Sequence, residues 1–175
     1  MKATITSLIF LLLSLTVSSQ TYKYIGIEEG LSNQKIYKIQ KDARGYMWFL
    51  THVGIDQYNG KEIKHYKLRE GNRELDPLLN INWTFLDKTG TLLVTGKQGR
   101  IFRYDSDRFV QIYNMYNYWN KDYHAFVRYS YIDQEDNVWL CGKSAIHLFN
   151  IESGQKQQIS NRLGNITCIE QINSE

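Results

Sequence analysis

A repeat of about 45 residues constrains the fold of this chain more than any other sequence feature. Its clearest mark is an aspartate followed by a turn and a hydrophobic run, at Asp42, Asp87 and Asp133. A period of this length is too long for leucine-rich or ankyrin units, and it fits the four short strands and turns of a propeller blade. We therefore predict an all-β fold, a partial β-propeller with about three four-stranded antiparallel blades.

The first copy of the repeat is clear enough to divide into strands. We expect strands over residues 36–40, 46–51, 55–58 and 62–66. The turn between the first two needs residues that tolerate tight or left-handed backbone. Asp-x-x-Gly supplies this in the first two copies, and Asp136-Asn137 serves in the third. The recurring aspartates are thus interpreted as turn residues, in preference to paired acid–base catalysts.

One position of the repeat carries large apolar side chains. Trp48 and Trp139 occupy it in the first and third copies, and Leu93 stands there in the second. A side chain of this size can pack one blade onto the next, so we expect a core role for it.

The remaining segments of the chain follow from these repeats. An extra strand is expected at Tyr22 to Ile27, ahead of the first blade. The predicted domains are a signal peptide at 1–19 and an incomplete propeller at 20–175, with blades at about 30–68, 79–114 and 125–160 and the start of a fourth at about 164–175.

The N-terminus has the three-part layout of a secretory signal. Lys2 gives a positive start, residues 5–17 are mainly apolar, and Val17-Ser18-Ser19 offers small residues at a cleavage position. The alternative is an uncleaved membrane anchor, since the uncharged run is near the lower length limit for a span. The sequence therefore predicts export by a signal peptide.

Composition excludes several classes of protein. The chain has 175 residues, of which 42% are hydrophobic and 14% aromatic, too many for a disordered chain. Lys and Arg exceed Asp and Glu by 21 to 18, a surplus too small to argue for nucleic-acid binding by this segment.

The sequence contains few motifs that are typical of catalytic or metal-binding sites. None of the four histidines stands in a His-x-x-x-His pattern and no Cys-x-x-Cys occurs, so neither a metal site nor a cofactor is predicted. No Gly-x-Ser-x-Gly is present, which leaves no sign of a hydrolase nucleophile and no candidate catalytic residue. Cys141 and Cys168 both lie in strand-like runs on different repeats, and we interpret them as small buried residues, the alternative being a disulfide.

One segment stands out between the second and third copies, at residues 113–124. It interleaves aromatic residues with Asn, Lys and Asp, a composition that suits stacking on sugar faces and hydrogen bonding to hydroxyl groups. The candidate ligand-binding residues are Tyr116, Tyr118, Trp119, Tyr123 and His124. The alternative is an aromatic loop that packs over the neighbouring blade.

An ordered string of residues in the first copy resembles a known family. The string comprises Gly30-Leu31-Ser32-Asn33, Ile36, Ile39, Asp42, Gly45, Trp48, Thr51, Gly54, Tyr58 and Gly60. It resembles the two-component regulator propeller repeat, which builds periplasmic sensors of hybrid two-component systems in Bacteroidetes-type bacteria. The resemblance covers about residues 22–172, and the second and third copies are degenerate.

The resemblance implies a function for the chain. It implies a non-catalytic, periplasmic ligand-sensing segment that responds to oligosaccharides from polysaccharide breakdown. Its expected partners are such an oligosaccharide and the remaining blades and signalling domains of an intact sensor anchored in the inner membrane. The chain would then be an N-terminal piece of that sensor.

Two other functions stay open. A stand-alone secreted interaction module would assemble blades as a homo-oligomer, and a discrete, concentration-dependent oligomer would favour it. A fragment of a propeller enzyme is the third hypothesis, although no repeated histidine or Asp-box constellation supports it.

Overall fold

The computed structural model describes residues 22–118, 126–143, 145–160, 166 and 169. The predicted signal peptide at 1–19 and nearly all of the predicted start of a fourth blade lie outside these residues. So do Cys168 and three of the candidate binding residues, Trp119, Tyr123 and His124.

Twelve of the strands form three four-stranded antiparallel sheets, in which each strand pairs with its neighbour in sequence. The first sheet contains β1 (Ile36–Lys41), β2 (Met47–Thr51), β3 (Ile55–Tyr58) and β4 (Ile63–Tyr66). The second contains β7 (Trp83–Leu86), β8 (Leu92–Thr95), β9 (Arg100–Asp105) and β10 (Arg108–Asn114). The third contains β11 (Tyr129–Ile132), β12 (Asn137–Cys141), β13 (Ala145–Asn150) and β14 (Lys156–Ser160).

The connections between the sheets carry short elements of their own. The first connection forms a small hairpin, β5 (Arg69–Glu70) and β6 (Arg73–Glu74), followed by the helix α2 (Pro77–Asn80). The second connection begins with the 3-10 helix η1 (Met115–Asn117).

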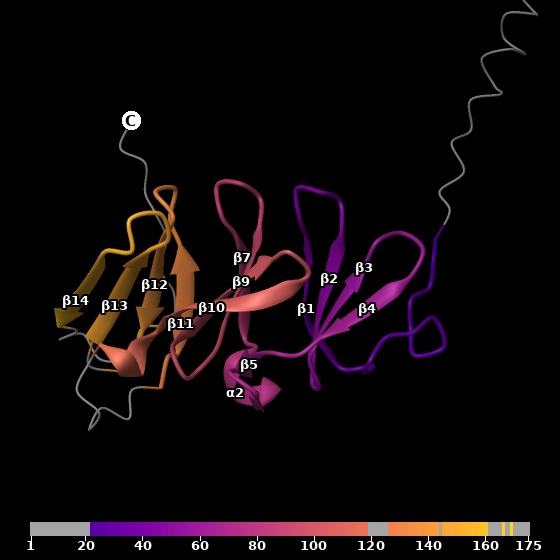
Figure 1. Ribbon diagram of the computed structural model, residues 1–175, viewed down its shortest axis with the longest axis horizontal. Helices are drawn as coiled ribbons and strands as arrows, with labels where there is room; N and C mark the ends of the chain where they lie inside the picture. Colours follow the sequence, from indigo (N-terminus) through magenta and orange to yellow (C-terminus); the bar gives the residue numbers. More distant parts are fainter. Residues whose placement is uncertain (1–21, 119–125, 144, 161–165, 167–168, 170–175) are drawn as a thin grey trace, which may run out of the picture.

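The three sheets stand side by side in chain order (Figure 1). Strand β7 contacts both β1 and β11, so the first strand of each sheet is its inner strand, and β4, β10 and β14 are the outer strands. The turns β1–β2, β7–β8 and β11–β12 lie along one side of the row, and α2 lies at the opposite side. This blade arrangement confirms the predicted propeller fold, and the four strands expected in the first copy form within one residue of their predicted bounds.

The extra strand predicted at Tyr22 to Ile27 does not form, and this prediction is wrong. Residues 22–25 belong to no sheet, and residues 27–30 make a turn. Local hydrogen bonds close it, because Gly30 donates its N–H to the Ile27 carbonyl at 3.0 Å and Leu31 donates to Gly26 at 2.9 Å. Gly30 adopts a φ of 107°, which is accessible to glycine and costly for other residues.

Two apolar cores hold neighbouring sheets together. The first lies between the first two sheets and includes Trp48, which is fully buried, together with Leu92 and Val94 of β8. The second lies between the second and third sheets and includes Leu93 of β8. Because successive side chains of a strand point to opposite faces, β8 supplies both cores and is buried on both sides.

The packing role expected for the shared repeat position is confirmed for Trp48 and Leu93. Each lies in the core between its own sheet and the next. In the third sheet Val138 and Leu140 join the core with the second sheet, so Trp139 between them faces the other way and is only partly buried.

The repeated aspartates organise the first turn of each sheet. In the first turn Asp42 is buried, and its Oδ1 accepts hydrogen bonds from the backbone N–H groups of Arg44 and Tyr46, both at 3.0 Å. Its Oδ2 accepts one from the indole Nε1 of Trp48 at 2.9 Å. One carboxylate therefore fixes the turn and orients the tryptophan that packs on the next sheet.

The third turn repeats this geometry. Asp133 accepts from the N–H groups of Glu135 at 3.0 Å and Asn137 at 2.8 Å, and from Trp139 Nε1 at 2.8 Å. Burial works to raise the pKa of Asp133, but these hydrogen bonds outweigh it, and the pKa is held below its usual value. The turn-forming interpretation of the aspartates is confirmed by these contacts.

The second turn keeps its aspartate although this copy of the repeat has leucine in place of tryptophan. Asp87 accepts from the N–H groups of Thr89 and Thr91, both at 2.9 Å. Leu93 offers no N–H in its side chain, and Arg103 on β9 instead forms an ion pair with Asp87 Oδ2 at 2.8 Å.

Replacing Asp42 with alanine tests the importance of the turn. We expect Asp42→Ala to lower the free energy of unfolding by about 2 to 4 kcal/mol, because three hydrogen bonds are lost and the indole N–H is left buried without an acceptor. Urea denaturation followed by tryptophan fluorescence measures this change.

The matched control is Asp105→Ala, since Asp105 is exposed and, among the described residues, its carboxylate accepts a side-chain hydrogen bond from Ser106 Oγ alone, at 2.9 Å. We expect this variant to lie within about 0.5 kcal/mol of the native chain. Equal losses in the two variants would contradict the role given to Asp42.

His147 gives the fold a defined response to acid. It is buried on β13, and burial lowers its pKa to about 4 from an ordinary value of 6.5. Because the folded pKa is depressed, neutral His147 contributes stability that is present above pH 6.5 and lost as the pH falls toward 4. The free energy of unfolding should therefore drop across this window, by up to about 1.4 kcal/mol per pH unit from this one group.

An NMR titration of the His147 ring protons checks the cause of this drop, with urea denaturation at each pH as the second measurement. The His147→Asn variant should lose this part of the slope, whatever its absolute stability. A His147 resonance that titrates near pH 6.5 in the folded chain would overturn the assignment.

Candidate functional site

The predicted binding segment starts at the end of β10, where the chain leaves the second sheet. Asn114 caps η1 by accepting a hydrogen bond from the N–H of Tyr116 at 3.1 Å. Tyr116 packs partly against the core between the second and third sheets. Of the five candidates, only Tyr116 and Tyr118 belong to the described residues.

Tyr118 has both packing contacts and an exposed surface. Its ring stacks on Tyr113 with the centroids 5.6 Å apart and the planes within 4°. The Lys156 ammonium of β14 lies 3.8 Å from its ring centroid, a cation–π contact between the second connection and the third sheet. About half of the Tyr118 side chain is still exposed, at 52%.

A hollow lies at the other end of this connection, beside the inner strands of the second and third sheets. Its lining residues are Trp83, Lys97, Phe126, Val127 and Arg128, and its volume is about 360 Å³. We call it the inner hollow. Two aromatic side chains and two cationic side chains form a lining that combines apolar faces with hydrogen-bond donors, as small-molecule sites do.

Backbone hydrogen bonds fix the walls of the inner hollow. The N–H of Val127 donates to the Lys97 carbonyl at 2.9 Å, and the N–H of Arg128 donates to the Cys141 carbonyl at 2.8 Å. Phe126, adjacent to these anchored residues, is 51% exposed. The backbone that follows Phe126 is therefore fixed, which lowers the cost of ordering this wall when a ligand binds.

Sequence reasoning missed the residues of the inner hollow. Phe126 stands two positions beyond the aromatic segment at 113–124, and Trp83 lies in the second copy of the repeat, outside the motifs singled out above. Trp83, Lys97 and Phe126 come from different strands and connections, so only the packing of the second sheet against the third brings them together.

A polar and aromatic cluster joins the first and second sheets. The hydroxyl of Tyr66 on β4 donates to Asp107 Oδ1 at 2.7 Å and lies 3.1 Å from the hydroxyl of Tyr104. Burial is the main cause that raises the pKa of Tyr66, so its hydroxyl stays protonated and acts as a donor. Lys64 forms an ion pair with Asp107, and the hydrogen bond from Lys64 is the main cause that holds the pKa of Asp107 below its usual value.

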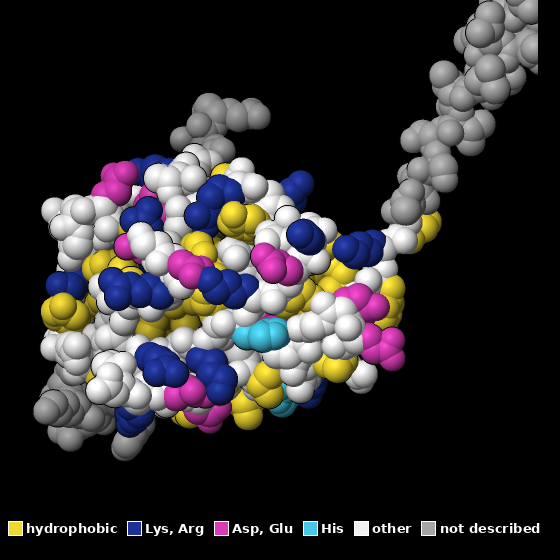
Figure 2. All heavy atoms as spheres, turned by 45° about the vertical axis from the view of Figure 1, so that its right-hand side comes forward, with side chains coloured by type: hydrophobic (Ala, Val, Ile, Leu, Met, Phe, Trp, Pro, Cys, Tyr) yellow, Lys and Arg dark blue, Asp and Glu magenta, His cyan; other side chains and the backbone are white. Residues whose placement is uncertain are grey.

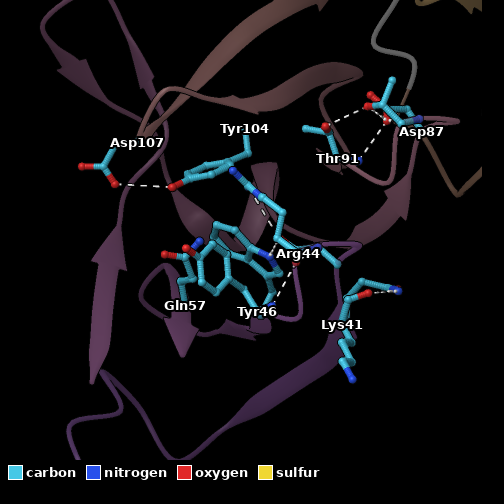
Figure 3. Close-up of polar contacts among 12 residues, drawn as sticks. Lys41, Arg44, Tyr46, Gln57, Asp87, Thr91, Tyr104 and Asp107 are labelled. Atoms are coloured by element: carbon cyan, nitrogen blue, oxygen red, sulfur yellow. Dashed lines mark hydrogen bonds and ion pairs between the residues drawn. The ribbon is translucent and has the colours of Figure 1, made fainter. Parts of the chain in front are cut away.

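Figure 3 shows how this cluster continues to the first turn. The Arg44 guanidinium lies 5.0 Å from the ring centroid of Tyr104 and 5.3 Å from that of Tyr46. The hydroxyl of Tyr104 points toward Asp107 on the far side, at 3.4 Å. The cluster is engaged internally, and we interpret it as a clamp between two sheets.

Neither a metal centre nor a reactive thiol emerges from the described part of the chain. Within residues 22–118, 126–143 and 145–160, no group of three or more His, Cys, Asp or Glu side chains could hold a metal ion. Cys141 is buried, which raises the pKa of its thiol to about 11. In the same ranges no helix has the length and apolar content of a membrane span.

Comparison with known proteins finds a family model that matches one segment of the chain and solved structures that share its fold. The model of the family described as two component regulator propeller matches residues 30–52. The matched residues include strands β1 and β2 of the first sheet. No curated protein matches the chain.

Solved structures resemble the whole described fold. The extracellular domain of the putative hybrid two component system BT4673 from B. thetaiotaomicron is 18% identical, with a TM-score of 0.64 over 86% of this chain. A second structure of that domain, titled as a putative one component system, is also 18% identical, with a TM-score of 0.61 over 89% of this chain. The extracellular domain of the putative hybrid two component system BT3049 from the same organism is 20% identical, with a TM-score of 0.59 over 79% of this chain.

The chain spans about a fifth of these solved domains, since the alignments cover 20% of each. At this level of identity the similarity establishes the fold that the chain shares with them.

The propeller repeat at 30–52 contains the contacts that define the first sheet. At its start the N–H and the hydroxyl of Ser32 both donate to Asp56 Oδ2 at 2.8 Å, which ties the Gly-Leu-Ser-Asn element to β3. At its centre lies the bond between Asp42 and Trp48. The repeat is therefore a structural unit, and the inner hollow lies outside it, at the next blade junction.

Proposed function

We propose that this chain is part of the periplasmic ligand-sensing propeller of a hybrid two-component system. The repeat at residues 30–52 carries this proposal, because it supplies the Asp42–Trp48 and Ser32–Asp56 contacts on which the first sheet depends. The fold shared with extracellular domains of such systems supports it. In this role the chain is non-catalytic and passes a binding event to signalling domains elsewhere in the sensor.

The ligand we propose is an oligosaccharide that docks at the inner hollow. Sugar rings present apolar faces that stack on aromatic side chains, and the exposed faces of Phe126 and Trp83 suit such contacts. Lys97 and Arg128 supply charged donors for hydroxyl or carboxyl oxygens. Tyr118 stands earlier in the same connection, whose last residues, 126–128, line this hollow.

Calorimetric titration of the full chain tests the ligand. The probes are oligosaccharides released from plant cell-wall, storage and host glycans, each added separately. We expect one structural class to bind, and Phe126→Ala to weaken that binding by about tenfold through loss of a stacking contact. Tyr22→Ala is the matched control, because Tyr22 is an 88% exposed aromatic far from the hollow in sequence and should leave affinity unchanged.

The outcomes separate the competing functions. Absence of binding to every oligosaccharide would remove the proposed ligand class. Mass spectrometry of the titrated mixtures would reveal shortened sugars if the chain were a piece of a propeller enzyme. Sedimentation velocity would reveal a discrete, concentration-dependent oligomer if it were a stand-alone interaction module.

A further inference from the structure

A second concave surface lies between the outer strands of the first and second sheets, well apart in the fold from the inner hollow. Its volume is about 640 Å³, and it is lined by β4, by the β5–β6 hairpin and by the start of β10. We call it the outer groove. This volume is in the range of sites that hold small molecules.

The outer groove has an aromatic floor and basic walls. Tyr66 and Phe109 form the floor, and both are almost wholly buried beneath it. Their rings pack edge to face with centroids 5.7 Å apart, so the floor is rigid. Arg69 stands on the wall made by the first connection, and Arg108 stands on the wall made by β10.

The carboxylates around the groove already have basic partners. These pairs are Asp107 with Lys64, Glu74 with Lys67 at 2.7 Å, and Glu70 with Arg73 at 2.6 Å and Arg100 at 3.6 Å. Another side chain of the lining, His65, contacts Asp56 Oδ1 at 2.8 Å. None of these carboxylates remains to neutralise further positive charge.

Arg69 and Arg108 are left without a carboxylate partner among the residues that the structure describes. Asp105 is opposite Arg108 in the β9–β10 register, but its carboxylate accepts from Ser106 and forms no ion pair with Arg108. A guanidinium presents paired N–H donors that match carboxylate and sulfate oxygens. Figure 2 shows Lys and Arg side chains interspersed with Asp and Glu side chains over one face of the molecule, so the site depends on the two unpaired guanidinium groups and not on a uniformly basic surface.

The turn that carries Arg108 is held in an unusual backbone conformation. Ser106 and Asp107 both have positive φ values, 45° and 71°, a region that glycine, asparagine and aspartate adopt more readily than other residues. The hydrogen bonds that Asp107 accepts from Lys64 and Tyr66 across the blade junction offset the cost of this backbone conformation. The consequence is a fixed rim, in which Asp107 is engaged and Arg108 is free to meet a ligand.

We propose that the outer groove binds a small ligand bearing at least two carboxylate or sulfate groups, one for Arg69 and one for Arg108. The body of the ligand lies over the Tyr66 and Phe109 floor. This site is separate from the oligosaccharide site proposed at the inner hollow, and its existence does not depend on that proposal.

Isothermal titration of the full chain with three probes tests the site. The probes are sucrose octasulfate, citrate and uncharged sucrose, each in 50 mM and 300 mM salt. We expect at least one anionic probe to bind with one-to-one stoichiometry and sucrose to give no heat. The double variant Arg69→Gln, Arg108→Gln should lose at least tenfold in affinity, because both guanidinium contacts are gone.

A matched double variant, Lys41→Gln with Lys61→Gln, removes the same charge from exposed positions outside the groove. It should keep the affinity of the native chain within about twofold. Binding of sucrose octasulfate alone assigns the site to sulfates, and binding of citrate alone assigns it to carboxylates. Equal losses in the two double variants would mean diffuse charge attraction and would overturn the proposal, as would no binding of either anion. Circular dichroism of both variants confirms that the comparison is between folded chains.

Discussion

The fold of this chain depends on one aspartate carboxylate in the first turn of each sheet, which is buried at Asp42 and Asp87 and partly buried at Asp133. Its Oδ1 atom holds the turn by accepting two backbone N–H groups, and its Oδ2 atom holds the indole of Trp48 or Trp139. Local chain reversal and contact between sheets are thereby tied to the same side chain. In the first sheet that indole lies in the core with β8, so the turn and the blade interface form together.

This dependence explains why the repeats could be predicted from sequence. The contacts of Asp42 span only six residues, and contacts at fixed short spacing leave a recurring pattern of letters. The extra strand at Tyr22 to Ile27 failed for the opposite reason. Strand formation there requires a partner from elsewhere in the fold, and hydrogen bonds around Gly26 and Gly30 satisfy the local backbone as a turn.

The candidate sites depend on contacts between residues far apart in the sequence, and they were not predicted from it. Trp83 begins β7 and Phe126 precedes β11, so the other strands of the second sheet lie between them in sequence. Arg69 on β5 and Arg108 on β10 belong to different sheets. Their proximity depends on how neighbouring blades pack and on how each connection runs. The predicted binding segment ends two residues before Phe126 in sequence, but its described residue Tyr118 contacts Tyr113 of β10 and Lys156 of β14, which are outer strands. The sequence contained no sign that Arg69 and Arg108 would face one groove.

The three copies of the repeat differ in sequence around the turn carboxylate, and a nearby contact compensates for each difference. Where Trp is replaced by Leu93, Arg103 supplies the missing partner for Asp87 at 2.8 Å. Where the turn glycine is replaced by Asp136, that residue takes a φ of 60° and accepts the N–H of Lys88 at 3.0 Å, which joins the second and third turns. Burial raises the pKa of Asp136, so this replacement retains a desolvation cost that glycine would avoid. Compensation of this kind at one carboxylate keeps the blades in place while the connections between them, which supply Arg69 and Phe126 to the candidate sites, can change.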